Sequence, residues 1–164
     1  MSYEQLAEQV QQTCKEFCAA LTQDEVSQFM RYVKVIELER GNILADVGEV
    51  GNSFYLVVAG TVQLFQLEGD NEFGVGEIVP GSLVGEMSFF DQRPRTLRLK
   101  SGGEGARLLE INRQMYNRLR IEEPYISSNL LEFVIRSLDE LVRQLSEENA
   151  VLNKQQLSAE AVAV

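Results

Sequence analysis

Glu86 and Arg95 are the charged side chains whose types and spacing point most directly to chemistry, within the segment Pro80–Ser101. A carboxylate can accept a hydrogen bond from a sugar hydroxyl, and a guanidinium can hold a phosphate through two parallel hydrogen bonds, which a lysine cannot reproduce. Gly85 lets the backbone approach a ligand closely. The apolar stretch from Glu86 to Phe90 predicts a short helix whose first turn presents unpaired N–H groups to an anion. The segment is therefore interpreted as a cradle for one small phosphate-bearing ligand.

The same residues also have simpler interpretations. Glu86 and Arg95 could form an ordinary surface ion pair, which contributes only about 0–1 kcal/mol. Thr96 could be a plain strand residue without any ligand contact. The spacing of the Glu–Arg pair favours the ligand interpretation. Arg93 and Arg98 are expected to be solvated rather than ligand-binding.

The composition excludes several classes of function. The formal charge of 15 − 25 = −10 disfavours nonspecific nucleic-acid binding, which depends on Lys and Arg against phosphates. The chain has no histidine, which excludes a Ser-His-Asp triad, a His-ligated zinc and a His-ligated haem. Two cysteines alone cannot hold an Fe–S cluster, and Glu86 has no identifiable catalytic partner. We therefore expect no enzyme, no metal site and no cofactor.

Cys14 and Cys18 lie four residues apart in a helical pattern and are interpreted as small apolar residues on a buried helix face. No run approaches the roughly 18 apolar residues of a membrane-spanning helix, so no membrane partner is expected. The first residues lack the basic and apolar regions of a signal peptide, which favours a cytoplasmic location.

Hydrophobic periodicity divides the chain into three regions. Residues 1–33 predict N-terminal helices, the second of which starts at Thr22, where the glutamate three residues on completes a capping box. Residues 34–112 alternate with a period of two and predict several short strands, separated by turn signals that include Gly60 and Gly102-Gly103. The fold class is therefore mainly β with flanking helices, an antiparallel β-roll of the jelly-roll or double-stranded β-helix type.

Residues 113–157 predict a short helix followed by a long C-terminal helix that starts near Pro124. Leucines recur every seven residues along it, and three places on lie Val134, Leu141 and the polar Glu148, which makes about three heptads of a coiled-coil seam with a polar defect late on. These leucines are Leu131, Leu138, Leu145 and Leu152. The seam could pack on its own domain or form a homodimer, and the sequence leaves both open. Residues 158–164 are expected to fray.

Residues 84–97 resemble the phosphate-binding cassette of the cyclic nucleotide-binding domain family, which includes catabolite-activator-like regulators and kinase regulatory subunits. That cassette reads Gly-Glu, a short helix, and then Arg followed by Ala, Ser or Thr. Here Gly85-Glu86 and Arg95-Thr96 occupy these places, and Pro94 precedes the arginine. The resemblance spans roughly residues 20–145, and upstream it includes Gly41, Leu44, Gly48, Phe54-Tyr55, Val57, Gly60 and Val62.

The resemblance implies a role for each cassette residue. Glu86 would accept a hydrogen bond from a ribose 2′-hydroxyl lying beside the backbone of Gly85. Arg95 would pair with the cyclic phosphate, helped by Thr96 and by the N–H of Ser88. The ligand would be cAMP or cGMP, and Thr96 does not choose between them. With the residues that line the pocket, the implied ligand-binding set is Leu83, Val84, Gly85, Glu86, Met87, Ser88, Arg95 and Thr96.

The resemblance also implies how such a module signals. In this family the long C-terminal helix closes over the base, and ligand binding moves the cassette and this helix together. DNA-binding relatives place polar, base-reading side chains where this chain has Leu141 and Val142, which favours hydrophobic capping of the base. No DNA-binding domain and no nucleic-acid partner are expected, and the effector protein is unknown. The alternative is a non-catalytic interaction scaffold with a degenerate nucleotide pocket.

Overall fold

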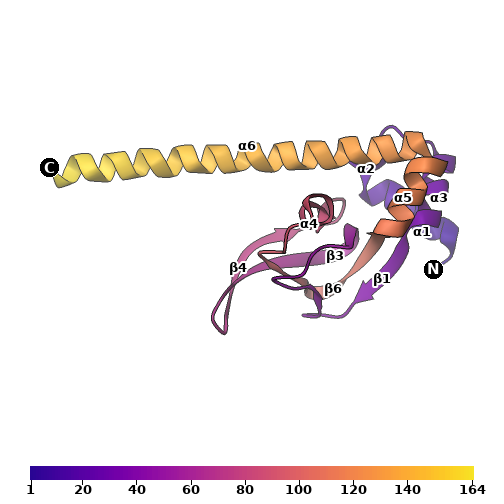
Figure 1. Ribbon diagram of the computed structural model, residues 1–164, viewed down its shortest axis with the longest axis horizontal. Helices are drawn as coiled ribbons and strands as arrows, with labels where there is room; N and C mark the ends of the chain where they lie inside the picture. The colour runs from indigo at the N-terminus through magenta and orange to yellow at the C-terminus, as the bar shows by residue number, and fades with distance from the viewer.

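An antiparallel sheet carries helices at one end, and one long helix runs across it and beyond it (Figure 1). This computed structural model describes residues 1–164. The strands are β1 (Lys34–Leu38), β2 (Ile43–Ala45), β3 (Ser53–Glu68), β4 (Asn71–Ile78), β5 (Leu83–Val84) and β6 (Arg98–Asn112). The helices are α1 (Tyr3–Thr13), α2 (Lys15–Cys18), α3 (Gln23–Phe29), the 3-10 turn η1 (Met30–Tyr32), α4 (Glu86–Asp91), α5 (Arg113–Glu122) and α6 (Pro124–Ala163). The predicted fold class is confirmed, and the sheet is open rather than a closed barrel.

The sheet is built around two long strands, β3 and β6, which pair along most of their length. The strand order is β1-β6-β3-β4, while β2 pairs with β6 and β5 pairs with β3. All pairings are antiparallel. The end of β5 beside β3 is the point at which the chain enters the cassette, so the sheet fixes where the cassette starts.

Gly60 and Gly102-Gly103 were predicted as turns between strands, and this prediction is wrong. The chain does not reverse there, because Gly60 lies inside β3 and Gly102-Gly103 lie inside β6. Gly60 has φ +68°, its backbone packs against that of Gly105, and the β3–β6 register shifts beside it. The strand pairing is irregular here without a reversal of the chain, and at Gly60 and Gly105 a positive φ calls for glycine, as it does in many turns.

The main hydrophobic core lies where the helices meet one end of the sheet. Cys14 and Cys18 are buried there as free thiols, as predicted, but they do not share one helix face, because Cys14 is the junction between α1 and α2. Burial raises the pKa of Cys14 to about 12 and that of Cys18 to about 11. The capping box at Thr22 is also confirmed, because its hydroxyl accepts a hydrogen bond from the Glu25 N–H at 3.2 Å.

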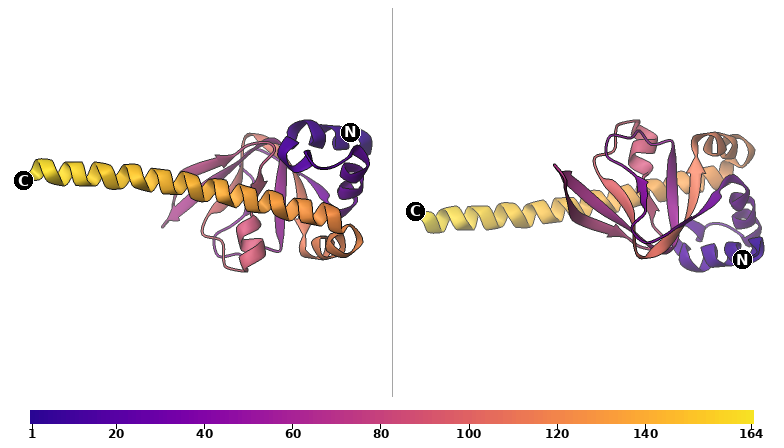
Figure 2. Two further views of the ribbon diagram at one scale, coloured as in Figure 1. Left: turned by 90° about the horizontal axis from the view of Figure 1, so that it is seen from above. Right: turned by 90° about the horizontal axis from the view of Figure 1, so that it is seen from below.

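Helix α6 begins at Pro124, as predicted, and its first turns are buried through Ile126, Leu130 and Phe133. From residue 139 onward every residue is exposed, and the helix extends well past the sheet (Figure 2). Residues 158–164, which were expected to fray, continue the helix as far as Ala163. This stretch holds alanine and glutamate and neither glycine nor proline, so nothing in it breaks a helix. No helix combines the length and apolar character that a membrane crossing requires.

Candidate ligand-binding site

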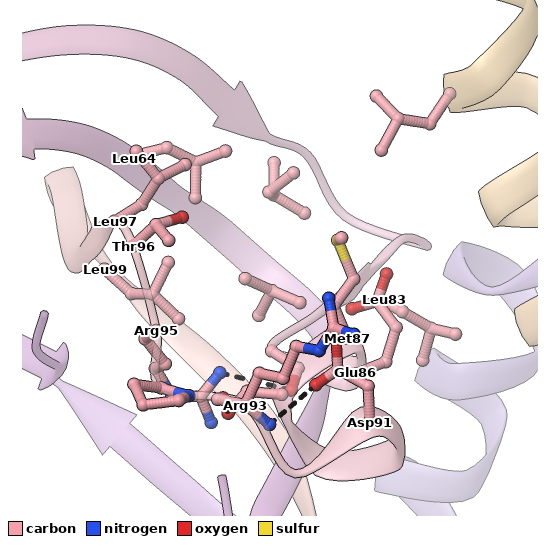
Figure 3. A pocket seen from close by; sticks show the side chains of 16 residues that line it. Leu64, Leu83, Glu86, Met87, Asp91, Arg93, Arg95, Thr96, Leu97 and Leu99 are labelled. Atoms are coloured by element: carbon pink, nitrogen blue, oxygen red, sulfur yellow. Dashed lines mark hydrogen bonds between the residues drawn. The ribbon is translucent and has the colours of Figure 1, made fainter. Parts of the chain in front are cut away.

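A pocket of about 370 Å³ opens between the cassette, the strands and helix α6 (Figure 3). The structure brings every predicted site residue to its wall: Leu83, Val84, Gly85, Glu86, Met87, Ser88, Arg95 and Thr96. Leu83 and Val84 form β5 and are buried, whereas Met87 and Thr96 are exposed at the surface of the pocket. The geometry therefore gathers the predicted set in one place, and their contact with a ligand stays a prediction.

Gly85 sits at the joint between β5 and α4 and has two reasons to be glycine. Its φ of +81° places it in the left-handed region, where a side chain would be strained. A Cβ added there would also lie 3.1 Å from Nη1 of Arg95. The residue thus allows α4 to start abruptly after the strand and lets the arginine lie against the backbone.

The Arg95 guanidinium is held by backbone carbonyls rather than by an acid. Nη1 donates to the Gly85 carbonyl and Nη2 to the Ser53 carbonyl, each at 3.2 Å. No carboxylate forms an ion pair with it, so the alternative of an ordinary Glu86–Arg95 surface pair is not what the structure shows. A guanidinium carries five N–H donors, and two are used here. The remaining donors of a fixed, half-buried cation are free for an anion.

The Glu86 carboxyl is one of two acidic groups that line the pocket, the other being that of Asp91. Burial raises the pKa of Glu86, while the N–H of its own residue and the positive charge of Arg95 act in the opposite direction. No side chain donates a hydrogen bond to this carboxylate. A desolvated carboxylate with free acceptor sites gains from a donor such as a sugar hydroxyl.

The Ser88 hydroxyl is already engaged inside the protein. It accepts a hydrogen bond from the Gly51 N–H at 2.8 Å and donates one to the Arg93 carbonyl at 2.6 Å. The side chain therefore ties the start of α4 to the turn that follows it. Only the backbone N–H of Ser88, which the resemblance implicates, remains a candidate for ligand contact.

Gly51 packs against the cassette, a contact that the sequence did not reveal. A Cβ at this position would lie 2.8 Å from Nη2 of Arg95 and 2.9 Å from the backbone N of Phe89. The loop before β3 can therefore lie directly against the cassette only because this residue has no side chain. Its neighbour Asn52 made Gly51 resemble a turn glycine, and no local signal indicated the close approach.

Beyond the predicted Leu83 and Val84, the pocket has a further apolar wall, of which the sequence indicated only one residue. It is formed by Leu64 from β3, Leu97 and Leu99 around the start of β6, Ile78 from β4 and Leu141 from α6. The sequence singled out Leu141 as facing the base, and the residue does line the pocket, whereas Val142 does not. This aliphatic wall thus draws on the sheet and, through Leu141, on α6.

Arg93 and Arg98, two other arginines near the cassette, differ in exposure and in ion pairing. Arg93 is exposed and lines the pocket, although it was expected only to be solvated. Arg98, also expected to be solvated, instead forms ion pairs with Asp46 and Glu72 across the sheet. That prediction failed for Arg98 because its partners are remote in sequence.

The C-terminal end of α4 is anchored by Arg113 of α5. The guanidinium carbon lies 3.8 Å from the centroid of the Phe89 ring, and Nη2 donates to the Phe89 carbonyl. Phe89 is fully buried and packs against Phe54 and Tyr116. Helix α4 is therefore coupled to α5, which leads directly into α6.

Known proteins resemble this chain in both sequence and fold. Residues 35–122 match the family described as the cyclic nucleotide-binding domain. The cyclic AMP receptor protein of Thermus thermophilus is 31% identical over 121 residues, which cover 73% of this chain and 56% of that protein. The cAMP-dependent protein kinase regulatory subunit of Dictyostelium discoideum is 31% identical over 88 residues, covering 51% of this chain and 27% of that subunit. The chain thus spans about half the length of the Thermus receptor, and less of the kinase subunit.

Solved structures give the same result. The catabolite activator protein of Thermus thermophilus superposes with a TM-score of 0.67 at 28% identity, over 82% of this chain and 63% of that one. A cyclic nucleotide-binding domain from Methylobacillus flagellatus has the same fold, with a TM-score of 0.75 at 17% identity, over 86% and 80% of the two chains. Since the family match covers more than half of the sequence and includes the whole cassette, this chain belongs to the cyclic nucleotide-binding domain family.

Proposed function

We propose that the protein is a non-catalytic sensor module that binds cAMP or cGMP in the pocket of Figure 3. Arg95 holds the cyclic phosphate, and Glu86 accepts a hydrogen bond from the ribose 2′-hydroxyl. The observation that carries the proposal is the guanidinium of Arg95, which is fixed by two carbonyls yet has no carboxylate partner. A half-buried cation of this kind gains most from an anion that arrives with the ligand.

The charge distribution supports a local rather than a general affinity for anions. The chain carries a formal charge of −10, so its long-range field repels nucleotides. Nucleotide binding therefore depends on short-range hydrogen bonds within the pocket. The base meets the aliphatic wall, whose member Leu141 belongs to α6. A ligand that contacts both Arg95 and Leu141 joins the cassette to the long helix, and this contact is the proposed route of signalling.

Isothermal titration calorimetry with cAMP, cGMP and linear 5′-AMP tests the binding proposal. The wild-type protein should bind at least one cyclic nucleotide, and more tightly than 5′-AMP. Arg95→Gln removes charge-assisted hydrogen bonds that contribute about 1.5–3 kcal/mol each, so affinity should fall ~100-fold. The control Arg107→Gln, at a residue that pairs with Glu37 and does not line the pocket, should change affinity less than threefold. No heat from the folded wild type with either cyclic nucleotide rejects the proposal.

A homodimer through α6 is the proposed assembly. The second half of the helix is exposed, including Leu145 at 50% and Leu152 at 60% of their surface, and these are the late positions of the leucine seam. A second copy aligned along this seam would cover them. Native mass spectrometry reports both the number of chains and any retained nucleotide mass. A purely monomeric mass at micromolar concentration contradicts the assembly.

An interaction scaffold is the second candidate function, and the exposed seam of α6 also favours it. In that case the pocket is degenerate and the helix docks a partner of another kind. Arg95→Gln then leaves partner binding and oligomer size unchanged. A nucleotide-dependent change in either, lost in Arg95→Gln, contradicts the scaffold.

A further inference from the structure

The loop of residues 46–51, between β2 and β3, packs against the cassette and forms hydrogen bonds with its backbone. The Gly48 N–H donates to the Arg95 carbonyl at 2.8 Å, and the Arg95 N–H donates to the Glu49 carbonyl at 2.8 Å. Two residues on, the Gly51 N–H donates to the Ser88 hydroxyl at 2.8 Å. One short loop therefore sets the position of Arg95 and of the first turn of α4.

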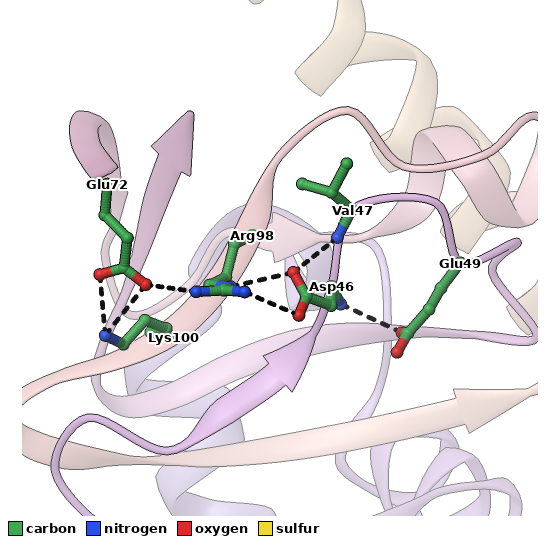
Figure 4. Close-up of polar contacts among 6 residues, drawn as sticks. All are labelled: Asp46, Val47, Glu49, Glu72, Arg98 and Lys100. Atoms are coloured by element: carbon green, nitrogen blue, oxygen red, sulfur yellow. Dashed lines mark hydrogen bonds and ion pairs between the residues drawn. The ribbon is translucent and has the colours of Figure 1, made fainter. Parts of the chain in front are cut away.

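Arg98 of β6 forms an ion pair with Asp46, the first residue of this loop, and so connects the loop to the sheet (Figure 4). Its Nε donates to Oδ1 of Asp46 at 2.9 Å and its Nη2 to Oδ2 at 3.0 Å, a two-bond pairing that fixes direction as well as distance. The Asp46 carboxylate also accepts a hydrogen bond from the Val47 N–H at 2.8 Å, and the Asp46 N–H donates to Glu49 at 3.1 Å. The ion pair thus organises the turn that presents Gly48 and Glu49 to Arg95.

The same arginine is itself held from the other side. Nη1 of Arg98 donates to Glu72 of β4 at 2.6 Å, and Lys100 also contacts Glu72 at 3.1 Å. The side chains of Arg98 and Lys100 are each only 23% exposed. Two acids and two bases thus form a chain from the β4 hairpin to the loop. Because both ends of Arg98 are engaged, its guanidinium has little freedom to leave Asp46.

We propose that Arg98 is a positioning residue for the nucleotide pocket, acting through Asp46 and loop 46–51 on Arg95. Arg98 itself does not line the pocket, so it affects binding without touching the ligand. The inference rests on the proposed function for its effect on binding. Its structural step, from Arg98 to the backbone of Arg95, stands on hydrogen bonds that are independent of any ligand.

Amide hydrogen exchange on the ligand-free protein tests the structural step. Arg98→Gln should raise the exchange rates of the Gly48 and Arg95 amides at least tenfold relative to wild type. The matched control is Arg107→Gln, on the same strand, which removes the ion pair with Glu37 at the β1 edge. The control should leave both amides unchanged. Equal rates in Arg98→Gln and wild type, or equal increases in both variants, overturn the proposal.

Nucleotide affinity tests the second step. Arg98→Gln should weaken binding of whichever cyclic nucleotide the wild type binds by about tenfold, while Arg107→Gln stays within threefold. Asp46→Asn, which keeps the shape of the partner, should reproduce the loss, and the double variant should be no weaker than either single variant. Should Arg98→Gln fail to fold, Asp46→Asn supplies both readouts. If a variant's amides exchange faster but its nucleotide affinity is unchanged, the proposed link between the loop and binding is overturned. If the wild type binds no nucleotide, the proposed function is refuted, but the hydrogen-exchange result still tests the structural step.

Discussion

Replacing Gly51 by alanine adds one methyl group where the loop meets the cassette. The new Cβ would lie 2.8 Å from Nη2 of Arg95, 2.9 Å from the N of Phe89 and 3.1 Å from the carbonyl carbon of Ser88. The arginine can rotate away, but it then loses its bond to the Ser53 carbonyl. The two backbone atoms cannot rotate away, so α4 must shift as a unit.

The magnitude follows from two opposing terms. Inserting a methyl group into a packed site costs about 1–3 kcal/mol, while exchanging glycine for alanine stabilises by about 0.4–1 kcal/mol through the unfolded chain. Gly51 has no positive φ, so no backbone strain is added. The net expectation for Gly51→Ala is therefore a loss of about 0–2.6 kcal/mol, with a midpoint of about 1.3 kcal/mol, in the free energy of unfolding. The displaced Arg95 should also weaken nucleotide binding.

Urea unfolding of the ligand-free protein measures this difference, and Gly103→Ala is the matched control. Gly103 has no positive φ, and a Cβ there meets nothing within 4 Å. The control should be as stable as wild type or more stable by up to about 1 kcal/mol. A Gly51→Ala variant as stable as Gly103→Ala would refute the close approach between loop and cassette.

Three further predictions concern the carboxylate, the long helix and the thiols. Burial raises the pKa of Glu86 above its value in the unfolded chain. The ionised carboxylate therefore destabilises the folded state, and this effect grows as the pH rises from the unfolded pKa through the folded one. Without ligand, Glu86→Gln should therefore be the more stable protein in urea at pH 7, with the advantage vanishing below pH ~4; an equal difference at both pH values contradicts this. Leu145→Glu combined with Leu152→Glu should convert the proposed dimer to monomer in native mass spectrometry, because charges would enter an apolar seam; a persistent dimer would place the contact elsewhere. Cys14, with its pKa raised to about 12, should resist a thiol reagent at pH 8 until the protein unfolds; rapid labelling of folded protein would contradict its burial.

Features encoded by neighbouring residues could be predicted from the sequence. The capping box at Thr22 and the start of α6 at Pro124 depend only on residues within one turn. The cassette from Gly85 to Thr96 is likewise one contiguous segment, and for this reason all its predicted residues reach one pocket.

Features that depend on strand pairing or remote contacts could not be predicted. Gly60 was assigned to a turn because turns and bulges both use positive φ, and only the continuous pairing of β3 with β6 separates the two. Arg98 finds its partners 52 and 26 residues away, at Asp46 and Glu72. The aliphatic wall of the pocket likewise depends on the sheet and on where α6 crosses it.

A crystal structure of the protein grown with saturating cAMP or cGMP tests the central claim most directly. The account predicts that a phosphate oxygen lies about 2.7–2.9 Å from a guanidinium nitrogen of Arg95, with the ribose 2′-hydroxyl on Glu86. Nucleotide density at another surface, or an unliganded Arg95 in crystals soaked with both nucleotides, would contradict it.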